Sequence, residues 1–424
     1  MPCIWYLDIS LFPLTSHYGS RCKRLPYIHN KGFIFNMKVL IAMSGGVDSS
    51  VAAYLMKEQN YQCTGVTMKL FHNADIALTE KHTCCSLDDV EDARSVARLL
   101  KIPYYVFNFS DCFHQCVVDK FVRSYECGMT PNPCIDCNRY LKFEKLLQRA
   151  KVLGFDYIAT GHYARVERDP VTGRYLLKKG LDASKDQSYA LYTLTQEQLA
   201  QTLFPLGTLT KQKVRSIAQQ HGIVTAHKQD SQDICFVPDG KYADFIKQYT
   251  GKTYPPGDFV DRDGNILGTH KGIIHYTIGQ RRGLEIAAGK RQYVCSIDTE
   301  LNCVVLGQDK DLYTKTLIAK NINLISLEVM EKPMRLKAKV RYRHTEQWAT
   351  VIQLESDTLR VSFDEPQRAV TKGQSVVLYD GDIVVGGGII VETFPHLCYN
   401  DTKNKERCHN DDFNQRPLLS KGDD

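Results

Sequence analysis

Residues 38–50, KVLIAMSGGVDSS, join an apolar run to a loop with two adjacent glycines. The next residues, 51–58, are helix formers, so we predict a strand, a tight loop and a helix in direct succession. Gly45 and Gly46 would let backbone N–H groups converge on an anion at the positive end of that helix. A Walker-type loop would also need a lysine before a final Ser or Thr, and this loop has none.

The loop is therefore predicted to hold phosphate without a lysine of its own. The hydroxyls of Ser44, Ser49 and Ser50 can donate hydrogen bonds to phosphate oxygens. Asp48 could cap the helix or help to hold a magnesium ion. A bare Ser-Gly-Gly would fit an ordinary turn equally well, but the full string SGGVDS is more specific.

Two cysteines lie in stretches without helical or strand periodicity. Cys137 belongs to the loop TPNPCIDCN at residues 130–138, directly before a helix predicted over residues 140–152. The positive end of that helix would lower the pKa of the Cys137 thiol and favour the thiolate. Cys235 lies in DSQDICF at residues 230–236. Two reactive thiols beside a nucleotide loop predict sulfur transfer.

The same cysteines allow a metal site as an alternative. Cys134 and Cys137 have the spacing of a ligand pair, and Cys84, Cys85 or Cys235 could complete a site for zinc or an iron–sulfur cluster. CxxC is a common ligand spacing, so the metal site stays open, but we favour sulfur transfer without a bound metal at these cysteines.

Composition limits the class of protein. The chain has 424 residues, 43% hydrophobic and 24% charged, as expected of a globular protein with two or three domains. No apolar run reaches the ~18 residues of a membrane span, so no membrane partner is expected. The net charge of +6 is small, so an RNA surface would have to be a local basic patch. Fifteen cysteines without a signal peptide indicate a reducing compartment, and we predict a cytoplasmic protein.

Residues 1–36 have no helical or strand periodicity, and Met37 stands directly before the first predicted strand. We interpret this segment as an unstructured extension or a start assigned too far upstream. It is also poor in acids and carries several Arg and Lys residues, so a transit peptide for the mitochondrial matrix is the alternative.

Strands alternate with helices through the first half of the chain. We predict strands over residues 63–70, 102–109 and 156–160, and helices over 88–101 and 113–125. This alternation predicts an α/β fold with a doubly wound parallel sheet, whose ligand binds beyond the carboxyl ends of the strands. Met68, Gly161 and His162 fall at such ends. Met68 would otherwise be a core residue, and His162 a buried structural histidine.

The second half is predicted to form two further domains. Thr195 and Gln198 make a capping box for a helix through residue 203, after which Pro205 marks the first boundary. Short strands follow, one of them over residues 277–284, and the pattern becomes all strand from residue 317. We predict an ATP-binding catalytic domain (37–204), a small central α+β domain with Cys235 (205–313), a C-terminal β-barrel (314–394) and a disordered tail (395–424).

A basic stripe is predicted in this barrel. A strand over residues 337–343 would place Lys337, Lys339, Arg341 and Arg343 on one face. A solvated barrel face is the ordinary explanation. Together with the basic segment at residues 280–282, the stripe could instead form a track for RNA phosphates.

From Met37 to about residue 393 the chain resembles the bacterial and organellar tRNA-specific 2-thiouridylases, which convert the wobble uridine of certain tRNAs to 2-thiouridine. The motifs that carry the resemblance are SGGVDSS (44–50), TPNPCIDCN (130–138), ATGHY (159–163), DASKDQSY (182–189), DSQDICF (230–236), GQRRGL (279–284), VRYRH (340–344) and FDEPQRAVTKGQSVVLYDGD (363–382). The set is highly specific, and it includes neither terminal extension.

The resemblance implies roles for individual residues. Cys137 and Cys235 would be catalytic, with a persulfide on Cys235, and a disulfide between them would form during turnover. The implied ATP contacts are Ala42, Met43, Ser44, Gly45, Gly46, Val47, Asp48, Ser49, Met68 and Gly161. The implied target-base region is Asn132, Pro133 and Cys134, and the implied tRNA contacts are His162, Lys185, Asp186, Gln187, Arg341, Tyr342 and Gln374.

The family also implies partners and chemistry. ATP with Mg²⁺ would adenylate the uridine O2 and release pyrophosphate, the anticodon arm of tRNA would be the substrate, and a cysteine desulfurase or sulfur-relay protein would donate sulfur. Many members have Asp at position 134, a proposed acid or base, whereas this chain has Cys134. That departure removes a carboxylate from the position.

Two other functions stay open at this stage. Another pyrophosphate-loop ligase could adenylate a carboxylate or carbonyl and add ammonia, although it would need neither paired reactive cysteines nor a basic barrel. An RNA-binding protein with a decayed nucleotide site is the other, and the intact SGGVDSS argues against it.

Overall fold

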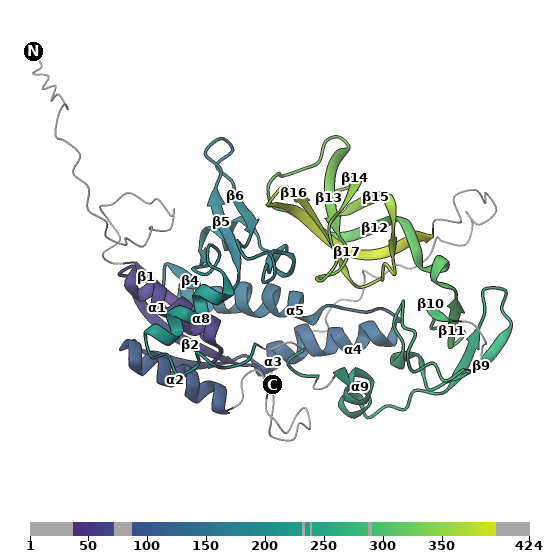
Figure 1. Ribbon diagram of the computed structural model, residues 1–424, viewed down its shortest axis with the longest axis horizontal. Coiled ribbons are helices and arrows are strands. Elements are labelled where there is room, and N and C mark those ends of the chain that lie inside the picture. Colours follow the sequence, from purple (N-terminus) through teal and green to yellow (C-terminus); the bar gives the residue numbers. More distant parts are fainter. Residues whose placement is uncertain (1–36, 72–86, 231–233, 238–239, 287–290, 396–424) are drawn as a thin grey trace, which may run out of the picture. The chain divides into compact units, whose positions relative to one another are not determined.

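The structure is a computed structural model, and it describes residues 37–71, 87–230, 234–237, 240–286 and 291–395 (Figure 1). The predicted extension at residues 1–36 lies outside the described residues, as do residues 396–424 of the predicted tail. The domain boundaries predicted from the sequence stay predictions.

A parallel sheet in the order β3-β2-β1-β4-β7 carries the glycine loop, as predicted. Its strands are β1 (Lys38–Ala42), β2 (Gln62–Lys69), β3 (Tyr104–Asn108), β4 (Tyr157–Ala159) and β7 (Thr202–Leu203). Val39 and Ile41 of β1 pack into one hydrophobic cluster and Leu40 into another. Helices therefore cover both faces of the sheet, which is the doubly wound arrangement.

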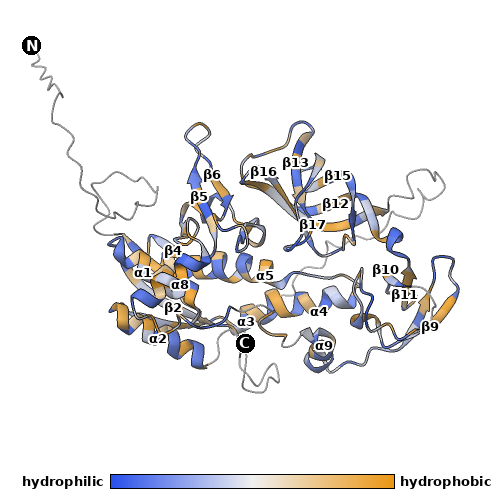
Figure 2. Ribbon diagram, in the orientation of Figure 1, coloured by the Kyte–Doolittle hydropathy of each residue, from blue (hydrophilic) through white to orange (hydrophobic). Residues whose placement is uncertain are grey.

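The helices around this sheet supply the two clusters, and their apolar residues are orange in Figure 2. The helices are α1 (Val47–Glu58), α2 (Leu87–Leu100), α3 (Ser110–Phe113), η3 (His114–Val118), α4 (Asp119–Glu126), α5 (Pro133–Asp136), η4 (Cys137–Lys145), α6 (Leu146–Val152), η5 (Ser188–Leu191), α7 (Gln196–Ala200) and α8 (Lys211–Gln220). Val51 of α1 and Val214 of α8 share one cluster with Val39 and Ile41, so α8 packs beside α1 (Figure 1).

A second, smaller sheet follows in the order β10-β11-β8-β9. Its strands are β8 (Gly257–Val260), β9 (Ile266–His270), β10 (Tyr293–Asp298) and β11 (Cys303–Gly307), and α9 (Tyr242–Thr250) precedes them, with the short turns η7 (Ile273–His275) and η8 (Asp309–Leu312). This is the predicted central α+β region. The strand predicted over residues 277–284 is wrong, because Gly279 and Gly283 have φ values of +87° and +75° and turn the chain there.

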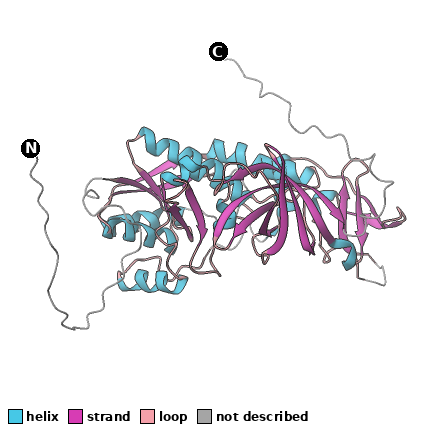
Figure 3. Cartoon of the chain, turned by 90° about the horizontal axis from the view of Figure 1, so that it is seen from above, coloured by secondary structure: helices cyan, strands magenta, loops and turns pink. Residues whose placement is uncertain are grey.

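The last strands form a closed barrel, as predicted, and Figure 3 shows them as one curved sheet. They are β12 (Tyr313–Leu324), β13 (Met334–Lys339), β14 (Gln347–Glu355), β15 (Thr358–Arg368), β16 (Ser375–Asp380) and β17 (Ile383–Pro395). The order is β12-β15-β14-β13-β16-β17, and β12 also pairs with β17, which closes the barrel. The hairpin β5 (Ala164–Arg168) and β6 (Tyr175–Lys179) pairs with β17 through Ile383 and Lys178.

Other predicted boundaries differ from the structure. The capping box of Thr195 and Gln198 is confirmed, but its helix ends at Ala200, and Thr202 and Leu203 join the parallel sheet instead. The strand predicted over residues 337–343 ends at Lys339, because β14 begins only at Gln347 and the residues between form the connection. The predicted stripe of four aligned cations is therefore wrong.

Candidate active site

The glycine loop lies at the carboxyl end of β1, where the chain turns directly into α1. α1 begins at Val47, earlier than predicted, and Gly46 precedes it with an extended conformation and no side chain to cap it. The first N–H groups of a helix have no partner within the helix, so they can donate hydrogen bonds to a bound anion. Ser44 N donates to Ser49 Oγ (3.1 Å), and Ser49 Oγ donates to Gly46 O (3.0 Å). The loop is thus held open by its own serine hydroxyl.

At two positions of the site only glycine fits, because the backbone of another segment lies too close for a Cβ atom. Gly45 has a φ of +72°, and a Cβ there would lie 2.4 Å from the carbonyl oxygen of Asp89. A Cβ on Gly161 would lie 2.8 Å from the carbonyl carbon of Asp48 and from Ser49 N. Gly161 therefore lies directly against the first turn of α1, and its predicted contact with ATP stays a prediction.

The other predicted ATP residues differ in how they face the site. The side chains of Met43 and Val47 are buried in the core, so these residues offer a nucleotide only their backbone. Ser44 is exposed and Ala42 is half-buried. Met68 is buried near the carboxyl end of β2 and packs against the cluster that contains Leu40.

Asp48 is the centre of a charged cluster beside the loop. Lys211 Nζ lies 2.8 Å from both carboxylate oxygens of Asp48, and the hydroxyl of Tyr163 donates to Oδ1 (2.7 Å). Burial, and next the charge of Asp48, raise the pKa of Tyr163, so its hydroxyl stays protonated. Neither Lys211 nor Tyr163 was predicted from the sequence. Lys211 is far from the loop in sequence, and the ATGHY motif was the only signal at Tyr163.

This cluster continues to the segment that precedes Cys235. Asp230 accepts ion pairs from Lys211 (2.7 Å), Lys185 (2.8 Å) and Arg215 (3.0 Å). Burial alone would raise the pKa of Asp230, but the bonds from Lys185 and Lys211 lower it. Lys185, a predicted tRNA contact, is therefore an ion-pair partner of Asp230 in this structure.

The loop that carries Cys137 folds differently from the prediction. Asn132 caps a helix by accepting from Cys134 N (3.2 Å), and Pro133 takes its first position. The helical run of α5, η4 and α6 therefore starts seven residues earlier than predicted, from 133 and not 140. Cys134 is exposed in the first turn, and Cys137 is half-buried one turn further along. The prediction that Cys137 directly precedes a helix is thus wrong.

Cys137 and Cys235 pack against the same hydrophobic cluster, although they come from distant parts of the sequence. Both thiols are half-buried. Within the described residues, no three His, Cys, Asp or Glu side chains gather closely enough to hold a metal ion. Cys84 and Cys85 of the alternative metal site lie outside the described residues.

The barrel holds the Cys137 loop through one turn. Gln374 Nε2 donates to the carbonyls of Thr130 (2.8 Å) and Pro131 (3.2 Å), and Thr130 N donates to Lys372 O (3.0 Å). A Cβ on Gly373, whose φ is +88°, would lie 3.2 Å from Thr130 N. Gln374, a predicted tRNA contact, therefore positions the Cys137 loop in this structure.

The predicted tRNA residues 185–187 form the link between the glycine loop and the barrel. The backbone and side chain of Gln187 bond to the backbone of Tyr163. The carboxylate of Asp186 accepts from Gly180 N and from both donors of Ser188, and its carbonyl accepts from Tyr342 of the barrel (3.1 Å).

His162 is buried, with 8% of its surface exposed, and its Nδ1 bonds to Thr160 Oγ1 (2.7 Å). Burial, with a smaller contribution from Lys142, holds the pKa of His162 well below its usual value. His162 is therefore a neutral core histidine in this structure, and its predicted contact with tRNA stays a prediction.

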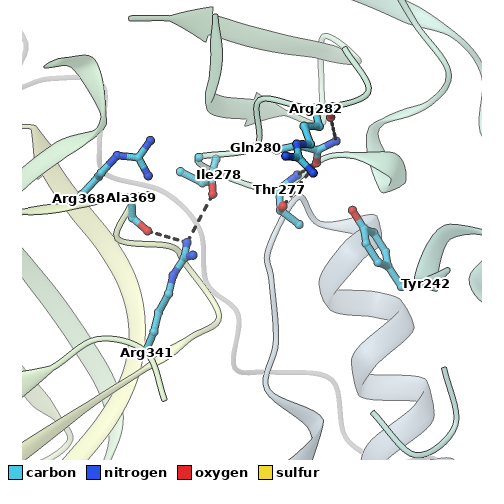
Figure 4. Close-up of a pocket in the computed structure, with 9 residues that line it drawn as sticks. Tyr242, Thr277, Ile278, Gln280, Arg282, Arg341, Arg368 and Ala369 are labelled. Carbon is cyan, nitrogen blue, oxygen red and sulfur yellow. Dashed lines mark hydrogen bonds between the residues drawn. The ribbon is translucent and has the colours of Figure 1, made fainter. Parts of the chain in front are cut away.

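A pocket of about 480 Å³ lies where the central sheet region meets the barrel (Figure 4). Arg341 reaches across this junction and donates to Ala369 O (2.7 Å), Thr371 Oγ1 (2.6 Å) and Ile278 O (3.4 Å). Arg282 and Arg368 line the pocket as well, and Arg368 pairs with Asp309 (2.9 Å). Three guanidinium groups around one hollow suit a phosphate.

No helix within the described ranges is long and apolar enough to cross a membrane.

Three family models together match most of the chain. The model described as the tRNA methyl transferase HUP domain matches residues 37–239. The tRNA methyl transferase PRC-barrel domain matches residues 243–308, and the aminomethyltransferase beta-barrel domain matches residues 314–390.

Curated relatives match over nearly their whole length. The tRNA-specific 2-thiouridylase MnmA of Clostridioides difficile is 54% identical over 355 residues, which are 84% of this chain and 98% of that protein. The protein of the same name from Acetivibrio thermocellus is 56% identical over 355 residues, 83% of this chain and 99% of the relative.

Solved structures resemble the chain far less. NMN synthetase from Francisella tularensis covers 51% of this chain and 79% of its own, with 15% identity and a TM-score of 0.30. A 4-thiouridine synthetase–RNA complex with bound ATP covers 51% of this chain and 50% of its own, with 18% identity and the same TM-score.

Proposed function

This chain belongs to the tRNA-specific 2-thiouridylase family, enzymes that form 2-thiouridine in tRNA, and we propose that it activates the target oxygen with ATP and moves sulfur through Cys235 and Cys137. Membership of the family rests on the 54–56% sequence identity to two curated relatives over 98–99% of their length. The mechanism is our proposal, and it rests on the geometry of the glycine loop and the two cysteines.

ATP fits the glycine loop. The uncapped start of α1 provides N–H donors for phosphate oxygens, and Gly161 leaves room against that turn. In this step the uridine O2 attacks the α-phosphorus, and the bond to the leaving pyrophosphate breaks. The oxygen thereby becomes part of AMP, which is a far better leaving group. Asp48 has the oxygen ligands that Mg²⁺ prefers, and a bound Mg²⁺ would neutralise phosphate charge.

Sulfur replaces AMP in the second step. The outer sulfur of a Cys235 persulfide acts as the nucleophile, either while still attached to Cys235 or after release as hydrosulfide, and the new C2–S bond forms as the C2–O bond to AMP breaks. Cys137 attacks the sulfur of Cys235, either before or after that bond forms, so both orders leave a Cys137–Cys235 disulfide. An external thiol must then reduce the disulfide. Both thiols are half-buried at the edge of the same extended hydrophobic cluster, and the pairing itself is our proposal.

The substrate base must leave its stack to reach the loop, which costs a few kcal/mol and less in a single-stranded anticodon loop than in a duplex. Contacts to phosphates would repay that cost. The pocket of Arg282, Arg341 and Arg368 is the strongest candidate among the described residues for a backbone phosphate. A cysteine desulfurase or a sulfur-relay protein is the proposed donor to Cys235.

The decisive experiment is nucleoside mass spectrometry of tRNA incubated with the protein, ATP and a persulfide donor. We expect uridine to gain the mass difference of sulfur for oxygen, with AMP and pyrophosphate as the ATP products. A nitrogen-containing product would support the amidating ligase instead. ADP and phosphate as the main products would refute adenylation.

A further inference from the structure

The glycine loop has no lysine of its own, yet a lysine from another element lies on it. Lys211 is the first residue of α8, and only 9% of its surface is exposed. Its ammonium group contacts both oxygens of Asp48, the second residue of α1. It thus lies beside the helix start at which we place phosphate.

The position of Lys211 is unfavourable unless an anion is near. A cation at the first residue of a helix is repelled by the positive end of that helix, and a buried ammonium group loses its hydration. Asp48 and Asp230 offset both effects through bonds of 2.7–2.8 Å. The fold therefore holds the charged amine of Lys211 beside the loop, although its free energy would be lower at a solvated position.

The cluster is balanced in charge. Asp48, Asp230 and Asp182, whose carboxylate accepts from Lys211 N (2.9 Å), contribute three negative charges, and Lys211, Lys185 and Arg215 contribute three positive ones. Without a nucleotide, the carboxylate of Asp48 stands where the ammonium group would otherwise meet phosphate oxygens. Both are anionic oxygens at the same helix start, so one can replace the other.

We propose that Lys211 gives the β- and γ-phosphates of ATP the positive charge that a Walker loop takes from its own lysine, while Asp48 and Asp230 hold its ammonium group in place until nucleotide binds. This inference rests on the proposed use of ATP. A Walker lysine reaches the same phosphates from within its loop. Here the amine comes from α8, whose Val214 packs with α1 in one core cluster and fixes the distance between the two helices.

The test compares the affinities for ATP and AMP by calorimetry in Lys211→Met and wild type. Loss of a charge-assisted bond should weaken ATP binding about 10- to 100-fold. AMP has no β- or γ-phosphate, so its affinity should change less than about 2-fold. Lys211→Arg keeps the charge and should recover most of the ATP affinity. Lys213→Met is the matched control, because Lys213 is exposed on the same helix.

Equal loss of ATP and AMP affinity in Lys211→Met would mean that the lysine only supports the loop, and unchanged affinity for both would also overturn the proposal. If Lys211→Met does not fold, Lys211→Gln tests the same point, since its amide can still donate to Asp48. Failure of wild type to convert ATP to AMP and pyrophosphate would refute the proposed function itself. Normal cleavage by wild type, with no selective loss in the variants, would refute the lysine inference alone.

Discussion

Gly161→Ala is the sharpest test of where the nucleotide lies. The added Cβ would be 2.8 Å from the carbonyl carbon of Asp48 and 2.8 Å from Ser49 N. Both atoms are backbone, so neither can rotate away, and ordinary contact begins at 3.4 Å. The first turn of α1 must therefore move by about 0.6 Å, because Gly161 itself follows a strand of the parallel sheet.

The magnitude follows from that displacement. Overpacking of this kind costs about 1–3 kcal/mol of stability. A misplacement of about 1 Å at a reacting centre can cost ~100-fold in rate, so a shift of about 0.6 Å should lower pyrophosphate release by roughly 10-fold. ATP affinity should also fall, because the N–H groups of the turn are the proposed phosphate donors.

The assay is pyrophosphate release with tRNA and a persulfide donor, together with ATP binding and thermal unfolding. Gly154→Ala is the matched control for stability. Gly154 has a φ of +74° and nothing within 4 Å of an added Cβ, so its substitution strains the backbone by about 1–2 kcal/mol without touching the loop. Wild-type ATP affinity and rate in Gly161→Ala would refute our placement of the nucleotide, as would equal losses in both variants.

Three further predictions concern the cysteines, the barrel turn and the core histidine. Cys137→Ser and Cys235→Ser should each abolish thiolation but keep ATP and tRNA binding, whereas Cys134→Ser should keep measurable activity by nucleoside mass spectrometry. Equal loss in all three, with iron bound to anaerobically prepared wild type, would support a cluster. Gln374→Ala removes two hydrogen bonds to the Cys137 loop. Each is worth about 0.5–1.5 kcal/mol, so kcat for thiolation should fall about 10-fold at unchanged ATP affinity; an unchanged kcat with weaker tRNA binding would make Gln374 a tRNA contact instead. Because His162 has a lowered pKa when folded, the unfolded state binds more protons below pH 6.5, and stability should fall as pH drops from there. In chemical denaturation between pH 6.5 and 5, His162→Gln should have a slope shallower by up to about 1.4 kcal/mol per pH unit, and a slope equal to that of wild type would contradict the assignment.

The parts of the fold that sequence predicted well have local signals. The apolar run before Gly45 and Gly46 indicated β1 and its turn, and both are present. The capping box at Thr195 was also found where it was predicted. Each of these depends on residues within a few positions, so the chain itself carries the information.

One missed element had a local signal that was not used. Asn132 followed by Pro133 is a typical helix start, with a capping residue and a proline at the first position. This start places Cys137 one turn inside the helix, so the positive helix end acts mainly on the exposed Cys134. The reactivity that we propose for Cys137 would then come from its surroundings and not from that helix end.

Other parts of the site had no local signal. Lys211 acts on residues of two distant segments, and only the packing of α8 against α1 brings them together. Arg341 was predicted on an outward-facing strand, but the strand ends at Lys339 and the next turn directs the guanidinium group to Ala369 and Thr371. Tertiary contacts of this kind are absent from any pattern of neighbouring residues.

The residues expected to touch tRNA also hold the protein together, and this affects how the family's tRNA contacts should be interpreted. Gln374 hydrogen-bonds the barrel to the Cys137 loop, and Tyr342 hydrogen-bonds it to Asp186, so replacing either residue disturbs the protein itself as well as any complex with tRNA. Arg341 differs from both. Its guanidinium group donates to the neutral oxygens of Ile278, Ala369 and Thr371, and it belongs to none of the ion pairs found among the described residues, so its charge is not neutralised there. A phosphate in the adjoining pocket could therefore interact with the full positive charge of Arg341 without breaking an internal ion pair. This makes Arg341 the best placed of the three residues to contribute binding energy for tRNA.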